Sequence, residues 1–229
     1  MRPRFKAFAD HALLVSFADE ISDDAHALVL SLDHAIAAQP PAGFVEAVPA
    51  LVNLLVSFDA LKTDYLVVEA HIRSLLDGLE MQETSGSLRR VQVCYEGDFA
   101  ADLDAVATAT GLSTEAVINA HLAGDYRVLM YGFAPGYAYM AGVSEQIQVP
   151  RKPSPVRDVP AGSVIIAGPQ CLVTTLTMPT GWSIIGRSST PILTGDPDRP
   201  FLFDVGDHVS FERIDLATFE RLSAEAAHV

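Results

Sequence analysis

Positive charge is scarce in this sequence, and the shortage excludes several classes of function. The 229 residues include 15 Lys and Arg against 29 Asp and Glu, a net charge of −14. Nucleic acids and anionic lipid surfaces are bound by clustered basic side chains, so we expect no nucleic acid and no membrane as partner. The only lysines are Lys6, Lys62 and Lys152, and none follows a glycine. The sequence therefore has no Walker A loop, and none of the three lysines lies in an M-K-M-like site for covalent biotin.

Cysteine, metal-binding patterns and long apolar runs are also missing. The two cysteines, Cys94 and Cys171, make no disulfide framework. The seven histidines show no H-x-x-x-H or H-E-x-x-H spacing, so we predict no metal site. The longest uncharged stretch, Val159–Gly186, is broken by Pro and Gly into runs too short to cross a bilayer. With no apolar region typical of a secretory signal near the N-terminus, we predict a soluble, cytoplasmic protein.

Residues 1–84 alternate between strand and helix patterns. The elements follow in the order β-α-β-β-α, which lacks one closing strand of a ferredoxin-like sandwich. We therefore predict a small α+β domain of that type. Its expected elements are a strand at His11–Phe17, a helix capped by Ser22, strands at Val45–Val48 and Leu51–Phe58 separated by Pro49, and a helix over 63–80.

Residues 85–229 are predicted to form a second domain, after a polar linker at 81–87. A strand at Leu88–Tyr95 and two short helices come first, one beginning after Asp98 and one running from a Ser113 cap to Gly124. After that point, short runs rich in Val, Ile and Thr alternate with Gly and Pro. This pattern is typical of a β-barrel or β-sandwich.

An aromatic loop lies at the start of the β-rich region, where residues 131–142 read Y-G-F-A-P-G-Y-A-Y-M-A-G. Pro135 and Gly136 predict a type II turn, because Pro fixes φ at one central position and Gly permits a positive φ at the next. Phe133, Tyr137 and Tyr139 flank this turn. We predict that the loop forms one wall of a site for a small planar ligand; the alternative is that its aromatic rings plug the end of a barrel.

A proline-rich segment with unusual charge follows. Residues 148–190 carry four basic and one acidic side chain, a net of +3 in an acidic protein. Arg151, Lys152 and Arg157 are held on a backbone stiffened by prolines, which lowers the entropy lost when they grip a carboxylate or phosphate. We predict that these three residues bind substrate. The alternative is that they pair with the chain's own acids.

Two further residues are candidates for catalysis. Gln170 follows Gly168-Pro169 beside a predicted strand, where its amide could orient the amide of a substrate or satisfy a nearby backbone group. His121 lies on the second short helix, beyond Val117 and Ile118, either as a proton carrier or as a hydrogen-bonded core residue.

These motifs together resemble a known family. The string G-F-A-P-G-Y-A-Y-M-A-G, followed by P-R-K-P-S-P, P-A-G-S-V, G-x-Q and P-x-G-W-x-x-I-G-R, is similar to the carboxyltransferase subdomain C and D family. That family contains the B subunit of 5-oxoprolinase, proteins named allophanate hydrolase subunit 1, and a sporulation histidine-kinase inhibitor. The resemblance implies a cyclophilin-like β-barrel after the small α+β domain.

The resemblance also implies a function and partners. The favoured function is one subunit of a heteromeric 5-oxoprolinase, which opens 5-oxoproline to glutamate with ATP bound by or with partner subunits. The implied partners are a second barrel-bearing subunit and a third subunit, and the isolated chain is expected to be inactive. The alternatives are an allophanate hydrolase subunit 1 or urea-carboxylase-like carboxyltransferase module, and a non-catalytic histidine-kinase inhibitor.

The sequence departs from the family pattern in one region. Where members commonly carry Q-T-G-V-Y-P and then T-P-G-G-W, this chain has Q-C-L-V-T-T at 170–175 and M-P-T-G-W at 178–182. Leu172 thus replaces a glycine, which adds a side chain where backbone could have approached a ligand.

Overall fold

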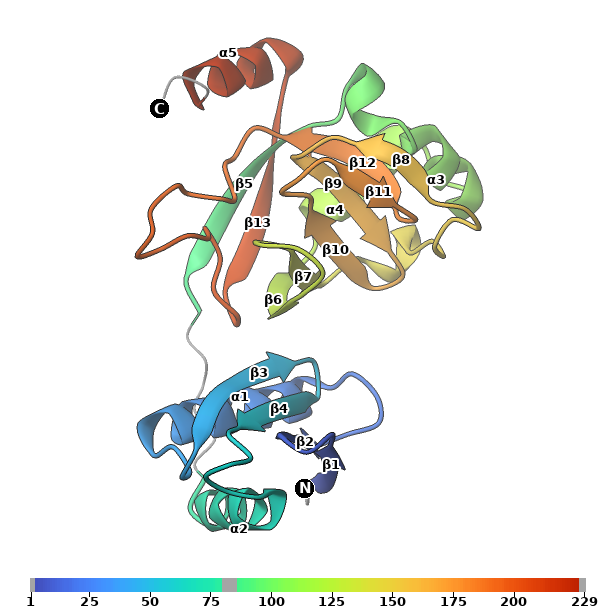
Figure 1. The fold of residues 1–229 in the computed structure, drawn as a ribbon. Coiled ribbons are helices and arrows are strands. Elements are labelled where there is room, and N and C mark those ends of the chain that lie inside the picture. Colours follow the sequence, from blue (N-terminus) through green and yellow to red (C-terminus); the bar gives the residue numbers. More distant parts are fainter. Residues whose placement is uncertain (1–2, 80–85, 227–229) are drawn as a thin grey trace. The chain divides into compact units, whose positions relative to one another are not determined.

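The computed structural model describes residues 3–79 and 86–226 and divides the chain into two compact units, 1–84 and 85–229. Most of the predicted linker, residues 81–85, lies outside the described residues. No helix in the described ranges is long and apolar enough to cross a membrane. Figure 1 labels the elements of each unit.

The first unit is a four-stranded antiparallel sheet with two helices. The strand order is β1-β2-β4-β3, so the expected closing strand is β1, supplied by the N-terminal end of the chain beside β2. This is the strand order of the predicted ferredoxin-like sandwich. The elements are β1 (Arg4–Phe8), β2 (Ala12–Ser16), α1 (Asp23–Ala38), β3 (Phe44–Ala50), β4 (Asn53–Phe58) and α2 (Tyr65–Leu76).

Side-chain caps fix where the two helices of this unit begin. The Ser22 hydroxyl accepts a hydrogen bond from the Ala25 amide at 3.3 Å, as the sequence predicts. The Asp64 carboxylate accepts from two amides in the first turn of α2, at 2.9 and 3.0 Å. The apolar stripe of α1 is buried against the sheet, which explains why a 3.6-residue period is visible in the sequence.

Pro49 does not separate the two strands, and that prediction is wrong. β3 continues through Pro49 to Ala50, and Pro49 lies opposite Leu54 of β4. Proline lacks an amide donor but is tolerated in an edge strand, and β3 is the edge of this sheet. The turn falls instead at Leu51, whose φ is +54°.

The second unit is built around a closed barrel of seven strands in the order β10-β7-β6-β13-β5-β12-β9. Its pairs are antiparallel except β13 with β5, which run in parallel side by side (Figure 1). A separate two-stranded sheet pairs β8 (Val156–Val159) with β11 (Met178–Thr180). The barrel strands are β5 (Leu88–Cys94), β6 (Tyr126–Tyr131), β7 (Ala138–Ala141), β9 (Ser163–Ala167), β10 (Gln170–Val173), β12 (Ser183–Ser188) and β13 (His208–Ile214).

The helices of this unit differ from the prediction in two places. The first helix, α3 (Leu103–Thr110), starts five residues after Asp98, because Gly97–Ala100 form a short 3₁₀ turn, η1. α4 (Thr114–Leu122) begins after its Ser113 cap as expected, and η2 (Glu145–Ile147) is a second 3₁₀ turn. α5 (Leu216–Ala226) was not predicted. A capping signal was present, since the Asp215 carboxylate accepts from the Thr218 amide at 2.8 Å.

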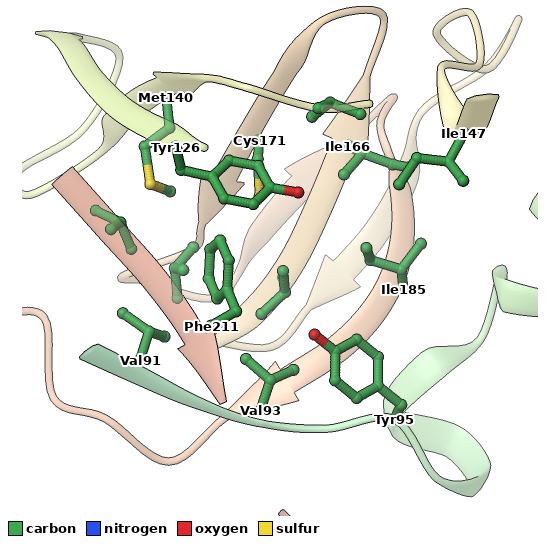
Figure 2. Packing of buried hydrophobic residues seen from close by; sticks show 14 of the residues in the cluster. Val91, Val93, Tyr95, Tyr126, Met140, Ile147, Ile166, Cys171, Ile185 and Phe211 are labelled. Carbon is green, nitrogen blue, oxygen red and sulfur yellow. The ribbon is translucent and has the colours of Figure 1, made fainter. Parts of the chain in front are cut away.

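Strand β9 of the barrel buries both of its faces. Val164 and Ile166 of β9 lie in the barrel core, whereas Ile165 and Ala167 of the same strand belong to a second apolar cluster. Figure 2 shows the interior, where side chains such as Tyr126 converge between the strands. A closed barrel has no hydrogen-bonding edge. Along β9, one apolar cluster fills the inside of the barrel and another covers its outside. The predicted α+β fold class, with a small sandwich followed by a barrel, is confirmed.

Candidate functional site

A small hollow forms in the second apolar cluster. Its volume is about 150 Å³, and its walls come from the aromatic loop, the proline-rich segment and strands β7, β9, β10 and β11. The segments that carry the sequence motifs therefore meet in space. The lining residues are Phe133, Tyr137, Tyr139, Arg151, Ile165, Leu172, Pro179, Thr180, Gly181 and Trp182.

The aromatic loop turns sharply at Pro135 and Gly136. Gly136 has a φ of +72°, and the Tyr137 amide donates to the Ala134 carbonyl at 3.1 Å, as expected for the predicted type II turn. A Cβ on Gly136 would lie 2.8 Å from Cδ2 of Leu193. Glycine is thus required here by both conformation and space.

Phe133 is the strained residue of the loop. Its φ is +72°, and the Ala134 amide donates across it to the Gly132 carbonyl at 2.9 Å, which closes a three-residue turn. A bulky residue in this region costs about 1–3 kcal/mol. Phe133 is 71% exposed, although its ring lies 5.7 Å from that of buried Tyr137. The turn, at this cost in strain, places an exposed aromatic ring beside the hollow.

Arg151 supplies the charge of the hollow. Its guanidinium lies 5.5 Å above the ring of Trp182, and none of the other lining residues is charged. Among the described residues, no carboxylate pairs with it. An unpaired cation beside aromatic walls suits a small ligand that has a planar body and one anionic group.

Lys152 forms an ion pair with an acidic side chain of the same protein, which is the alternative that the sequence left open for it. Its Nζ lies 2.5 Å from Oδ2 of Asp102, and its backbone amide donates to the Gly181 carbonyl at 2.7 Å. The same Asp102 oxygen accepts from the Ile184 amide at 2.7 Å. These bonds tie the proline-rich segment to β12 and so help to hold Arg151 over Trp182. The partner of Lys152 is 50 residues away, and no sequence spacing indicated it.

Two other predicted site residues, one for substrate binding and one for catalysis, are not among those that line the hollow. Arg157 is exposed on β8, and Gln170 is half-buried at the start of β10, opposite Ala141 and Ala167. The structure thus brings together Phe133, Tyr137 and Arg151, while Pro135 and Gly136 shape the loop. The roles of Arg157 and Gln170 stay predictions.

His121 lies inside the barrel core and not at the hollow. Its Nδ1 is 2.8 Å from the Tyr95 hydroxyl and its Nε2 is 3.5 Å from the Cys171 sulfur. Complete burial lowers the pKa of His121 to about 3, so the ring is neutral at pH 7. Cys171 points into the barrel (Figure 2), while its neighbour Leu172 lines the hollow, so β10 separates His121 from the site. This placement favours the core role, and proton transfer by His121 stays an untested prediction.

Several lining residues were not predicted as site residues. Tyr139 is one of the aromatic residues that flank the predicted turn, whereas Ile165 and Pro179 gave no signal beyond membership of the motifs. Leu172 and Thr180 are different, because both lie where the chain departs from the family pattern. Both departures line the hollow. No group of three or more His, Cys, Asp or Glu that could hold a metal occurs in the described ranges.

Comparison with known families agrees with the motif pattern. A family model described as carboxyltransferase domain, subdomain C and D, matches residues 3–203. Among curated proteins, the B subunit of 5-oxoprolinase from Bacillus subtilis (strain 168) is 33% identical over 237 residues, which cover 99% of each chain.

Solved structures give the same picture of the fold. The crystal structure of TTHA0988 is 34% identical with a TM-score of 0.77 and matches 90% of this chain; this chain spans only 40% of that one. The Kluyveromyces lactis urea carboxylase superposes with a TM-score of 0.81 over 97% of this chain and 23% of its own. At 16% identity, that second likeness shows the fold alone.

Proposed function

Because the chain belongs to the carboxyltransferase domain, subdomain C and D, family, we propose that it is the B subunit of an ATP-dependent 5-oxoprolinase. The observation that carries this proposal is the end-to-end match to a curated B subunit of 5-oxoprolinase. The likeness to the urea carboxylase adds no argument for an allophanate or urea substrate, since it extends to the fold only.

The hollow supports a small lactam as the ligand. 5-Oxoproline has a nearly planar ring with one carboxylate, and Arg151 offers an unpaired guanidinium for that carboxylate. The rings of Tyr137 and Trp182 would pack on the two sides of the lactam, with Phe133 at the mouth. Gln170 would orient the lactam amide from the neighbouring strand start, and Arg157 would assist an anionic intermediate.

The chain is proposed to bind and orient the lactam, while other subunits complete the reaction. Hydrolysis adds water across the lactam C–N bond, which requires proton transfers. The titratable residues that line the hollow are two tyrosines and Arg151. Burial raises the pKa of Tyr137 further above its usual value, so no lining residue is suited to act as a base near pH 7. We therefore expect no turnover by the isolated chain.

ATP is proposed to bind with or by the partner subunits. The hollow of about 150 Å³ lies below the range of about 300–1,000 Å³ that is typical for larger ligands, so it does not fit a nucleotide. The proposed partners are a second barrel-bearing subunit and a third subunit. A cytoplasmic location belongs to the same proposal and is supported by two free, buried thiols.

Reconstitution tests this function. The full chain, co-purified with the products of its neighbouring genes, is expected to convert 5-oxoproline to glutamate only when ATP is present. Failure of a correctly assembled complex to do so, together with inhibition of a histidine kinase by the free chain, would favour the kinase-inhibitor alternative instead.

Replacing Arg151 tests the site within that complex. Arg151→Gln keeps much of the side chain's length but removes the charge, so kcat/KM for 5-oxoproline is expected to fall about 100-fold through loss of one charge-assisted contact. Arg90→Gln is the matched control, because Arg90 is exposed and faces Glu212 at 3.5 Å. Equal kcat/KM values in the two variants would remove Arg151 from the site.

A further inference from the structure

A second cavity of about 360 Å³ opens where β9 begins and where β10 and β12 end. It shares no lining residue with the first hollow. Its polar side carries one arginine and several hydroxyls, and its other side is apolar. The lining residues are Ala161, Gly162, Thr174, Thr175, Arg187, Ser188, Ser189, Thr190, Pro191, Ile192, Leu193, Phe219 and Ser223.

Arg187 lies in this cavity without a counterion. None of the lining residues is acidic, although the chain carries 29 Asp and Glu. Its Nε is buried and has no hydrogen-bond partner in the described part of the chain. The guanidinium lies 5.2 Å from the ring of Phe99, which covers one side of it. Burial also lowers the pKa of Arg187, and a bound anion would offset that loss of solvation.

The hydroxyl groups of the three residues after Arg187 can also each donate a further hydrogen bond. The Ser189 hydroxyl is buried and unpartnered among the described residues. The Ser188 and Thr190 oxygens each accept a backbone amide at 3.0 Å, from Thr190 and Gln92, which leaves both hydroxyl protons without an acceptor in the same part of the chain. Buried polar groups are normally satisfied, so an acceptor is missing here.

The two hydroxyls that follow β10 already have acceptors of their own. Thr174 donates to the Pro160 carbonyl at 2.8 Å, and Thr175 donates to the Pro135 carbonyl at 2.7 Å. Apart from the Ser223 hydroxyl on α5, the free donors that line the cavity therefore concentrate at residues 187–190. Ile192, Leu193 and Phe219 supply an apolar wall in the same cavity.

We propose that this cavity binds a small phosphomonoester, with its phosphoryl oxygens on Arg187 and the hydroxyls of residues 188–190 and its organic part against Ile192, Leu193 and Phe219. A phosphoryl group presents three acceptor oxygens and a negative charge, which matches one guanidinium and three hydroxyl donors. The cavity volume leaves room for more than the phosphoryl group. This site is independent of the proposed 5-oxoprolinase function.

Calorimetric titration of the full-length chain with phenyl phosphate tests the site. Binding is expected, and Arg187→Gln should weaken it tenfold or more, as about 1.4 kcal/mol corresponds to a factor of ten. Arg151→Gln and Arg90→Gln make the same charge change elsewhere and should leave the affinity within about twofold. Equal losses in Arg187→Gln and Arg90→Gln, loss in Arg151→Gln alone, or no binding at all would overturn the proposal.

One further variant and one further ligand complete the test. Ser189→Ala should weaken phenyl phosphate about fivefold through one lost hydrogen bond, and this small change serves as the test if Arg187→Gln does not fold. An unchanged affinity in Ser189→Ala would then contradict the site. Benzoate offers a carboxylate on the same ring. In Arg151→Gln, whose first hollow has lost its cation, benzoate should bind at least tenfold more weakly than phenyl phosphate; equal binding in that variant would overturn the phosphoryl assignment.

Discussion

At the scale of single residues, burial decides what His121 does. The ring is neutral in the folded protein because its pKa is lowered to about 3, whereas an unfolded chain has a histidine pKa near 6.5. Between these values the unfolded state binds a proton that the folded state does not. Stability contributed by the neutral ring is therefore complete above about pH 6.5 and is lost as the pH falls toward 3.

This difference predicts how His121 affects unfolding. From pH 6 to pH 5, urea-induced unfolding of the wild type should show a loss of about 1 kcal/mol per pH unit from this group. His121→Asn cannot titrate, so its free energy of unfolding should be lower at pH 7 but should fall less steeply with acid. Identical slopes in the two proteins would mean that His121 is already protonated in the fold.

The chemistry of single residues was only partly visible in the sequence. Arg151 and Tyr137 were predicted as site residues and do line the hollow, because a cation and a ring beside Gly and Pro are unusual enough to notice. Lys152 has the same sequence signature as Arg151, yet it meets Asp102 at 2.5 Å. Which of two adjacent cations is free depends on a contact across 50 residues, which no local pattern encodes.

At the scale of elements, the aromatic loop depends on Gly136. Gly136→Ala would place a methyl group 2.8 Å from Leu193 and 3.1 Å from Thr175 at a φ of +72°. Gly195 has a similar φ of +76°, but a Cβ at that position would have nothing within 4 Å, so Gly195→Ala measures the conformational cost alone.

Comparing Gly136→Ala with Gly195→Ala separates the free-energy cost of backbone strain from the cost of crowding. Gly195→Ala should lower the free energy of unfolding by about 1 kcal/mol, and Gly136→Ala by about 2–4 kcal/mol, since overpacking adds to the strain. Chemical denaturation measures both. Gly136→Ala should also raise the KM for 5-oxoproline in the assembled enzyme, whereas Gly195→Ala should not. Equal losses of stability would show that Leu193 and Thr175 move aside freely.

Element boundaries were predictable where a side chain marks them. Ser22 and Ser113 cap the helices that follow them, as expected. Pro49 was misleading, because whether proline ends a strand depends on whether that strand is at the edge of its sheet, and β3 is. α5 was missed although its sequence is amphipathic and follows the capping residue Asp215, so the signal for a helix was present; none of its described side chains is buried.

At the scale of the whole molecule, the net charge of −14 is a sum that does not show the locally basic segment at residues 148–190. Arg151 and Arg187 both belong to the one basic stretch of the sequence, and within the described residues each lies unpaired in its own cavity. The composition predicted which partners to exclude and which segment to inspect. It could not predict two cavities, since these depend on closing β9, β10 and β12 into one barrel.

The same closure predicts a gradient of local stability across the barrel unit. β9 is buried at all five positions and pairs with β10 and β12, whereas none of the described side chains of α5 is buried. Amides open locally where few apolar contacts are lost. Hydrogen exchange at pH 7 should therefore be slowest in Ser163–Ala167 and faster by at least about tenfold in Leu216–Ala226. Equal protection of the two segments would show that the 4.6 Å contact between Phe219 and Phe99 is enough to make α5 part of the cooperative core.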